Sequence, residues 1–404
     1  MKKINLLLVI SAFFILASCS RSESIQSIDE VNLYTLQYGK FQEQLSVSEL
    51  NDVGNVRFGI AMQEGFFYIV NGESGKIMEL NSYGDLLTLF YNEDSDTEHI
   101  VKNSQLIPNY VLHEVAYPFE YTGLVTVDSN NRIYAACTIP ENRQEVSDDN
   151  SMLLCQAVLK FSRDGSEVEY IGQQGPGGTP FPSIKQIYTT EKDELVVVST
   201  TTKGLCVYWF SVDGFLKYMI PINISDVPTY TETEIDSEVL ITISNVVPDL
   251  ESYNLYVQLD YYSSYFDEDS KIQSGINYLQ SYLYTLDIEN GTYESPIQIP
   301  PYEESVISDY TKLTYRMPYD FLGITKSGWK FFIVKTENGF DIEMFQNENQ
   351  RVFRRHFNVN HSDIIYSAMN LTKDGIIDAI YIGKDCARVV WYRTDTLIAS
   401  ILKG

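Results

Sequence analysis

The sequence predicts an all-β fold, a six-bladed β-propeller of four-stranded antiparallel blades that follows a signal peptide and a short tether. Three observations carry this prediction. Of the 404 residues, 44% are hydrophobic and 13% are aromatic, which is enough apolar material for a large folded core. From about residue 55, short apolar runs alternate with turns rich in Gly, Asn and Asp. One strand pattern occurs six times, which gives more strands than the roughly seven to nine of a β-sandwich.

The N-terminus has the features of an exported, lipid-modified protein. Lys2 and Lys3 precede an almost unbroken apolar stretch over residues 4–16, too short for a membrane span but typical of a signal-peptide core. The next residues, Leu16-Ala17-Ser18-Cys19, resemble the lipobox of bacterial lipoproteins. This resemblance implies cleavage before Cys19 and lipidation of Cys19. The alternative is an ordinary secretory signal with an incidental cysteine.

The predicted organisation has three parts. Residues 1–18 form the signal peptide. Residues 19–50 form the lipidated N-terminus, with a polar tether up to about residue 30 and a strand that could close the propeller, and residues 51–404 form the propeller itself. The sequence has no second apolar stretch of about 18 residues, so we expect the lipid to hold the protein on a membrane of the bacterial cell envelope. The periplasmic and the outer surface of the envelope both remain open.

Each repeat reads as four short strands, with a tight polar turn between the third and the fourth. The pattern is clearest over residues 66–90 and recurs over residues 132–170 and 194–220. Weaker copies follow, and the last covers residues 376–402, where we expect the same pattern of strands and turns. The six second strands are centred on Tyr68, Tyr134, Val197, Tyr256, Phe332 and Tyr381.

A glycine-rich segment joins the second repeat to the third. It contains a turn, a Phe-Pro pair and then a strand, and its marker residues are Gly172, Gly175, Gly177, Phe181 and Pro182. This segment resembles the blade junction of NHL-type propellers, and residues 55–404 as a whole resemble propeller lipoproteins of this length. Glycines can also cradle a phosphate, but the lysine and the helix of a P-loop are both missing from the sequence here.

The longer connections are all expected on one face of the propeller. In a four-stranded blade, the connection from second to third strand and the connection to the next blade lie on the same face. All six long segments are of this kind: residues 91–117, 140–151, 172–182, 221–237, 263–278 and 300–317. They contain 19 acidic and 5 basic residues, within a chain that has 55 acidic and 29 basic residues.

This acidity excludes a general nucleic-acid binder, because neutralising phosphates requires clustered Lys and Arg. It favours an acidic rim that attracts a cationic partner. Ordinary exposed acids of an acidic protein would give the same composition. The candidate acidic residues of the binding face are Glu141, Asp148, Asp149, Glu232, Glu234 and Asp236.

Tyrosines are concentrated between residues 253 and 293. Tyr256, Tyr282 and Tyr284 fit strand alternation and are expected to pack within the blade. Tyr265 and Tyr278 fall in a connection instead, and they are candidate contact residues because aromatic side chains are enriched at binding surfaces.

Residues suited to metal binding are few. His99, His113 and His361 could converge on the channel mouth, with Asp94 or Asp96 as the carboxylate ligand. Their spacing matches no ligand pattern, and a solvated acidic loop explains the two aspartates equally well. We therefore expect no cofactor.

Four cysteines follow Cys19. Cys137 and Cys155 lie on consecutive predicted strands, and an exported protein could oxidise them to a disulfide. The alternative is four free buried thiols. No C-x-x-C motif occurs, so the sequence indicates neither a redox motif nor a zinc knuckle.

The first functional hypothesis is a lipid-anchored scaffold that binds a protein or peptide through the acidic loop face and has no catalytic residues. The second is a propeller enzyme, such as a metal-assisted lactonase or lyase at the channel mouth. A third is a passive structural part of an envelope complex. An enzyme should bring His, Asp, Glu or Asn residues together at one point, whereas a binding module should present a broad uneven surface.

Overall fold

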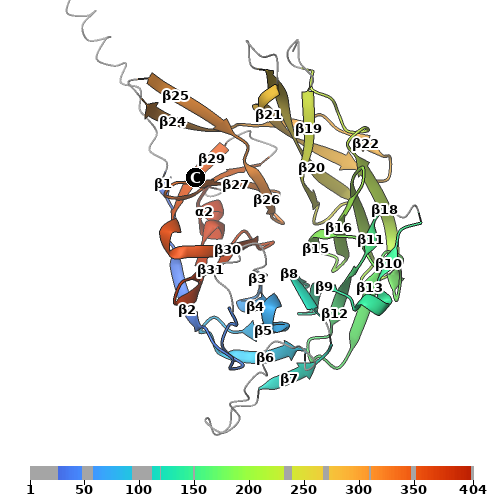
Figure 1. The fold of residues 1–404 in the computed structure, drawn as a ribbon. Coiled ribbons are helices and arrows are strands. Elements are labelled where there is room, and N and C mark those ends of the chain that lie inside the picture. The colour runs from blue at the N-terminus through green and yellow to red at the C-terminus, as the bar shows by residue number, and fades with distance from the viewer. Residues whose placement is uncertain are drawn as a thin grey trace, which may run out of the picture.

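The computed structural model describes residues 26–47, 58–92, 112–118, 120–148, 151–231, 239–266, 273–308, 311–346 and 352–401. In this part of the chain, six small sheets stand in a ring around a central axis (Figure 1), and each sheet is one blade of a β-propeller. Within each blade the first strand lies next to the axis, and the second, third and fourth strands follow outwards. The predicted fold class is therefore confirmed.

The first three blades follow one another along the chain. Blade 1 contains β3 (Phe58–Gln63), β4 (Phe66–Asn71), β5 (Lys76–Leu80), β6 (Leu86–Tyr91) and β7 (His113–Ala116). Blade 2 contains β8 (Glu120–Val127), β9 (Ile133–Thr138), β12 (Gln156–Phe161), β13 (Val168–Gly172) and β14 (Gly175–Pro176). Blade 3 contains β15 (Ile184–Thr189), β16 (Leu195–Thr201), β17 (Gly204–Phe210) and β18 (Leu216–Asn223).

Blades 4 to 6 complete the ring, and blades 5 and 6 each include a strand from the N-terminal part of the chain. Blade 4 contains β19 (Val239–Pro248), β20 (Asn254–Phe266), β21 (Gln273–Asp287), β22 (Thr292–Tyr293) and β23 (Ile297–Ile299). Blade 5 contains β26 (Asp320–Ile324), β27 (Lys330–Thr336), β28 (Gly339–Phe345), β29 (Val352–Asn358) and β1 (Gln26–Ser27). Blade 6 contains β30 (Ile364–Leu371), β31 (Ile377–Gly383), β32 (Cys386–Tyr392) and β2 (Val31–Gln37).

The remaining elements lie in connections. The hairpin of β10 (Glu145–Val146) and β11 (Leu153–Leu154) is inserted between the second and third strands of blade 2. The hairpin of β24 (Tyr302–Ser308) and β25 (Thr311–Met317) joins blade 4 to blade 5. Three 3₁₀ turns are η1 (Gly72–Ser74), η2 (Glu141–Arg143) and η3 (His361–Asp363), and one helix, α2 (Thr394–Ile401), follows β32.

The six predicted repeat centres all lie in second strands. They are Tyr68 in β4, Tyr134 in β9, Val197 in β16, Tyr256 in β20, Phe332 in β27 and Tyr381 in β31. All six side chains are buried. Short continuous apolar runs located them, because a blade strand is covered by a neighbouring blade on each face and only its ends and turns are polar.

Two expectations at the ends of the chain were wrong. The segment predicted as strands at the end of the sixth repeat forms helix α2 over residues 394–401, and the fourth strand of blade 6 comes from β2. The predicted tether includes residues that are not free, because β1 pairs in parallel with β29 and the Ile28 N–H donates to the His356 carbonyl at 2.9 Å. Both pairings join residues more than 300 positions apart, which a local pattern does not reveal.

The segment that leads from β2 to blade 1 is clamped from both sides. The Tyr38 hydroxyl donates to the Gly383 carbonyl at 2.7 Å. The ammonium group of the buried Lys76 donates to the carbonyls of Phe41, Gln42 and Gln44. These contacts tie the chain to blade 6 and then to blade 1, and so hold the ring closed.

The core lies between neighbouring blades rather than at one centre. Phe90 of blade 1 meets Phe161 of blade 2 with ring centroids 4.9 Å apart. Phe357 of blade 5 stacks on Tyr392 of blade 6 at 3.9 Å. Each such interface buries large apolar side chains, at a gain of about 25 cal/mol per Å². The blades are therefore fixed relative to one another, which gives the connections a rigid base.

Candidate functional site

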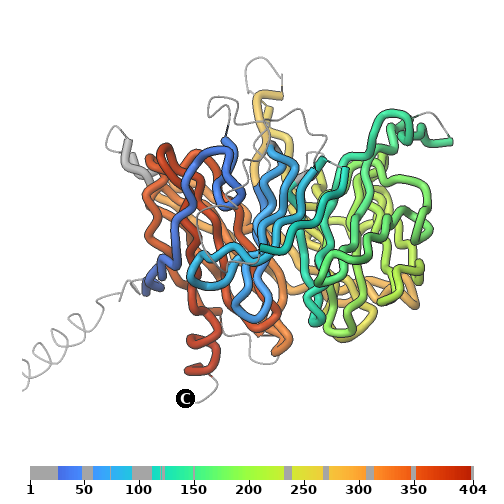
Figure 2. Tube along the Cα trace, turned by 90° about the horizontal axis from the view of Figure 1, so that it is seen from below, coloured from blue at the N-terminus to red at the C-terminus, as the bar shows by residue number. Residues whose placement is uncertain are grey.

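The long connections give the propeller two unlike faces. We call the side that carries the connections between second and third strands and between blades the loop-bearing face. We call the other side the short-turn face. In the side view of Figure 2, the β10–β11 hairpin and the ends of β20 and β21 project on the loop-bearing face, while α2 projects on the opposite side. The described parts of three predicted insertions, the β10–β11 hairpin, the outer ends of β20 and β21 and the β24–β25 hairpin, belong to these connections. The described part of segment 91–117 differs, because β7 runs parallel to β6 and therefore begins towards the short-turn face.

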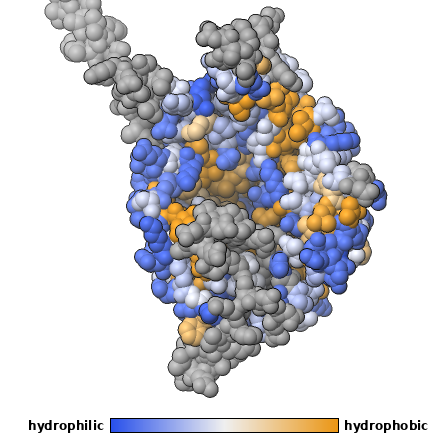
Figure 3. All heavy atoms as spheres, in the orientation of Figure 1, coloured by the Kyte–Doolittle hydropathy of each residue, from blue (hydrophilic) through white to orange (hydrophobic). Residues whose placement is uncertain are grey.

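The β20–β21 hairpin is the most extended of these projections, with strands of 13 and 15 residues. Its outer part carries apolar side chains that face solvent: Tyr265 is 50% exposed, Phe266 47% and Ile276 54%. Further exposed apolar residues of the same face are Val146, Leu153, Ile224, Leu240 and Tyr315. Figure 3 shows a hydrophobic strip on this face, over the region where Figure 1 places β19–β21.

The two candidate tyrosines of this hairpin differ. Tyr265 is exposed and pairs with Gly275 across the hairpin. Tyr278 is half-buried, its hydroxyl donates to Ser281 Oγ at 2.9 Å, and its ring meets that of Tyr262 edge-on at 5.8 Å. Tyr265 is therefore available to a partner, whereas Tyr278 supports the hairpin. Tyr256, Tyr282 and Tyr284 are buried, as predicted.

A buried carboxylate holds the base of the hairpin. Asp260 of β20 is 2% exposed and accepts hydrogen bonds from Ser244, Ser281 and the Gln258 amide. Gln258 also donates to the Tyr319 carbonyl at 2.7 Å and accepts from the Phe321 N–H at 2.8 Å. A fully hydrogen-bonded buried polar group of this kind fixes geometry. The network therefore joins the hairpin to blade 5.

Opposite charges lie beside this network at the channel mouth. The Lys185 ammonium group donates to the Ser244 carbonyl at 2.6 Å, and burial lowers the pKa of Lys185. Burial raises the pKa of Asp320, and the nearby Asp260 raises it further. Asp320 lies at the start of β26 and lines the channel. The mouth therefore presents a carboxylate next to an already engaged lysine.

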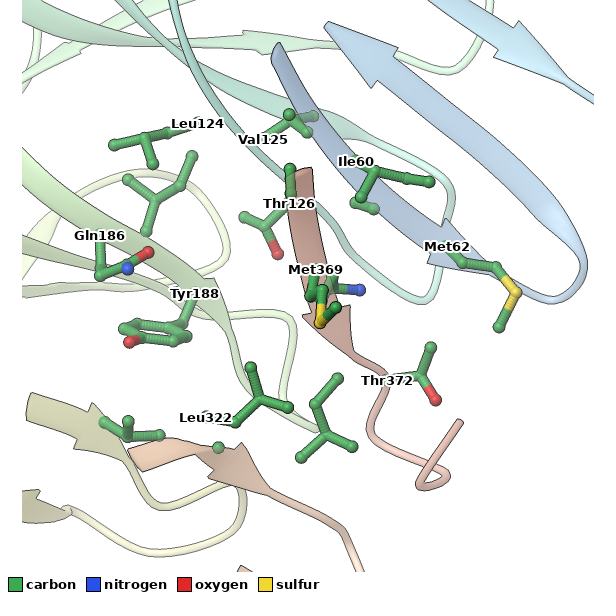
Figure 4. A pocket seen from close by; sticks show the side chains of 18 of the residues that line it. Ile60, Met62, Leu124, Val125, Thr126, Gln186, Tyr188, Leu322, Met369 and Thr372 are labelled. Atoms are coloured by element: carbon green, nitrogen blue, oxygen red, sulfur yellow. The ribbon is translucent and has the colours of Figure 1, made fainter. Parts of the chain in front are cut away.

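The central channel has a volume of about 430 Å³. Its walls are the inner strands β3, β8, β15, β19, β26 and β30, and Figure 4 shows their side chains around it. Ile60, Leu124, Leu322 and Met369 give the wall an apolar character, while Gln186 brings an amide group. Each inner strand has a strand partner on its outer side only, so its inner edge turns backbone N–H and C=O groups towards the channel.

The predicted acidic residues are only partly placed. Glu141 lies in η2 and Asp148 follows β10, and both are exposed in the blade 2 connection of the loop-bearing face. Asp149, Glu232, Glu234 and Asp236 lie outside the described residues.

The predicted metal ligands do not come together where they are described. His113 Nε2 lies against the Asp164 carbonyl beside blade 2, while His361 Nε2 lies 2.9 Å from the Gly339 carbonyl of blade 5. His99, Asp94 and Asp96 fall outside the described residues. In the part of the chain that the structure describes, no group of three or more His, Cys, Asp or Glu residues could hold a metal ion.

The disulfide expected between Cys137 and Cys155 is absent from the structure, in which both thiols are free. Cys137 pairs with Ala157, so Cys155 lies further along the ladder, where its carbonyl accepts from the Ile139 N–H. The Cys155 sulfur faces the Pro182 carbonyl at 3.9 Å, while Cys137 is buried between blades 1 and 2. Cys206 and Cys386 are free thiols as well. Cys19 lies outside the described residues, and no described helix could cross a membrane.

No protein-family model matches this chain, and no curated protein does either. Among solved structures, it is similar to a gluconolactonase from Xanthomonas campestris, at 9% identity and a TM-score of 0.41 over 91% of this chain and 98% of the other. It is also similar to a streptogramin B lyase, at 11% identity and a TM-score of 0.37 over 89% of this chain and 97% of the other. An ulvan lyase shows 11% identity and a TM-score of 0.39, over 90% and 83%. Similarity at this level concerns the fold alone.

Sequence reasoning missed several residues of the loop-bearing face, chiefly Phe266, Ile276, Lys185 and Asp320. Phe266 and Ile276 flank an acidic stretch at residues 267–269, where the alternating pattern continues beyond the length of a blade strand. The extra length of these two strands was the feature of the sequence that could have indicated a projecting hairpin. Lys185 and Asp320 come from blades 3 and 5, and only the closed ring brings them near each other.

Proposed function

We propose that this protein is a lipoprotein, anchored through Cys19, that binds a cationic protein or peptide on its loop-bearing face. The observation that carries the proposal is the exposed apolar end of the β20–β21 hairpin on a rigid base. Tyr265, Phe266 and Ile276 are about half exposed, while Asp260 beneath them is buried and fully engaged. Aromatic anchors held on a fixed scaffold are typical of binding hot spots.

Charge supports a cationic partner. The six long segments that the sequence pattern assigns to this face contain 19 acidic and only 5 basic residues. An excess of this size raises the association rate of a basic partner and suppresses acidic ones. The apolar hairpin end would form the contact area, and the surrounding acidic side chains would attract the basic partner and orient it.

The anchor constrains how the face is presented. Gln26 pairs with Arg355 at the outer edge of blade 5, only seven residues after Cys19. A fully extended chain spans at most about 3.6 Å per residue, so this edge would lie within roughly 25 Å of the lipid. The propeller would therefore sit close to the membrane with blade 5 towards it.

The test replaces Tyr265, Phe266 and Ile276 together by Ser and measures co-purification of partners with the full-length lipoprotein. The matched control replaces Tyr83, Val212 and Phe215, which are exposed apolar residues of the short-turn face. Loss of a hot spot costs about 2 kcal/mol or more, so we expect a partner to be depleted at least 10-fold from the hairpin variant only. Retention of every partner by the hairpin variant would refute the proposal.

A charge-reversal series tests the cationic nature of the partner. Glu141, Glu145 and Asp148 are changed to Lys, and the control changes Glu167, Asp213 and Glu251 of the short-turn face. We expect the first variant to lose the partner at low salt, and the difference to shrink above about 0.15 M salt, where the Debye length is about 8 Å. Equal loss from both variants would contradict the proposal.

A further inference from the structure

A cavity of about 830 Å³ lies at the outer part of blade 5, next to β24 and away from the central channel. The sheet of this blade runs in the order β1, β29, β28, β27, β26. Ser27 of β1 pairs with His356 of β29, and His356 pairs with Asp341 of β28. Three neighbouring strands thus place a serine, a histidine and an aspartate side by side in one row, and all three residues line the cavity.

The histidine and the aspartate are in direct contact. His356 Nδ1 lies 2.5 Å from Asp341 Oδ1, and the Asp341 side chain is only 8% exposed. A carboxylate at Nδ1 stabilises the tautomer that carries its proton there. In this tautomer Nε2 carries a lone pair, which can accept a proton from a hydroxyl group.

The serine lies on the other side of the histidine. Adjacent strands are about 4.8 Å apart, and paired residues point to the same face of a sheet. The hydrogen bond from Ile28 N–H to the His356 carbonyl, at 2.9 Å, fixes this register. Ser27 is exposed, so its hydroxyl is open to the cavity. The described residues show no Ser27–His356 hydrogen bond, and such contacts commonly tighten only when substrate binds.

From this arrangement we infer a hydrolytic site that acts on neutral or cationic carboxylic esters. Ser27 is its nucleophile, His356 is its general base, and Asp341 positions the imidazole. The inference is independent of the proposed partner binding. Glu304 and Glu337 also line the cavity, and their charge disfavours an anionic substrate. Asn358, two residues along β29 from His356, lines the cavity too, and its amide can donate to the developing oxyanion.

The reaction proceeds in two balanced steps. The Ser27 oxygen attacks the ester carbonyl carbon while His356 Nε2 takes the hydroxyl proton, and the imidazolium returns that proton to the leaving alkoxide, which departs as the alcohol. Water then attacks the acyl-serine ester while His356 accepts its proton. That proton passes to Ser27 Oγ as the carboxylic acid leaves.

The experiment uses the full-length lipoprotein in detergent, with a fluorophosphonate probe and p-nitrophenyl butyrate. We expect the probe to modify Ser27, identified by mass spectrometry, and Ser27→Ala to abolish both modification and ester hydrolysis. His356→Gln should slow both by about 10²-fold or more, the scale of general-base catalysis. His361→Gln and Ser362→Ala, in the turn η3 that leads from blade 5 to blade 6, should leave both rates unchanged.

Two further measurements test the substrate preference and the role of Ser27. A succinate half-ester, which is anionic, should react at least several-fold more slowly than the butyrate ester. If His356→Gln lowers the melting temperature, its loss of activity could come from unfolding. Ser27→Ala then tests catalysis alone, because β1 has only two residues, both exposed, and the change should leave the fold intact. No probe on Ser27 in the wild type, or wild-type hydrolysis by Ser27→Ala, would overturn the inference.

Discussion

The ammonium group of Lys373 donates a hydrogen bond to the backbone carbonyl of Thr190 at 2.7 Å. Lys373 lies in the turn after β30 of blade 6, and Thr190 follows β15 of blade 3, so the contact joins opposite blades across the axis. Lys326 N–H donates in turn to the Lys373 carbonyl at 2.9 Å, and Glu191 N–H to the Leu250 carbonyl at 3.0 Å. The Lys373–Thr190 contact bridges the channel at the short-turn face, and the other two join blade 5 to blade 6 and blade 3 to blade 4.

Replacing Lys373 by Met should therefore loosen the ring. A hydrogen bond from a charged donor is worth about 1.5–3 kcal/mol, and burial, which lowers the pKa of Lys373, offsets part of this gain. We expect the free energy of unfolding to fall by about 1–2 kcal/mol in a urea titration. Lys384→Met, at an exposed position of blade 6, is the control and should unfold like the wild type.

Asp378 should make stability depend on pH. It is completely buried, Asn370 Nδ2 donates to its Oδ1 at 2.9 Å, and no described group bonds to its Oδ2. Burial raises the pKa of Asp378 from 3.8 to about 7. Between these values the folded state binds the proton and the unfolded state does not, so this group's contribution to stability falls as pH rises through that window.

Asp378→Asn removes this dependence, because the amide is neutral at every pH. The variant should gain stability relative to wild type between pH 5 and pH 8, at about 1.4 kcal/mol for each pH unit over which the two states differ by a full proton. Asp385→Asn, at an exposed position, should show no such gain. Thermal unfolding at both pH values measures the effect, and a pH-independent difference for Asp378→Asn would contradict it.

The junction turn between blades 2 and 3 offers a matched pair of glycines. Gly175 has φ +116°, and a Cβ there would lie 2.9 Å from the Gly214 carbonyl oxygen, whereas Gly177 has φ +69° and open space around it. Gly175→Ala should cost about 1–3 kcal/mol through strain and crowding. Gly177→Asn should cost little, because Asn tolerates the left-handed region. Equal melting temperatures of the two variants would show that the turn is not strained.

Anchoring is tested at Cys19. Cys19→Ser should leave the propeller folded, because the described strands begin at Gln26, but should release it from the membrane fraction. Melting of the soluble form and a high-salt wash of the membranes measure the two parts. Membrane retention of the variant after that wash would contradict the lipoprotein proposal.

The blades were predictable from sequence because their information is local. Short apolar runs placed Tyr68, Tyr134 and Tyr381 in second strands, and the polar turns marked where strands end. Residues 394–401 were misread because their apolar positions suit a strand and a helix alike, and the choice depends on β2 occupying the outer edge of blade 6. Lys185 and Asp320 come near each other only through closure of the ring, and Ser27 meets His356 only because β1 pairs with β29.

Docking of a partner on the loop-bearing face can be measured by site-specific photo-cross-linking in intact cells. A photoreactive residue is placed at Tyr265, which is 50% exposed at the end of the β20–β21 hairpin, or at Tyr83, which is 84% exposed on the short-turn face. We expect a discrete adduct, with a partner rich in Lys and Arg at its cross-linked surface, from Tyr265 and not from Tyr83. The same adduct from both positions, or adducts from Tyr83 alone, would contradict docking on this face.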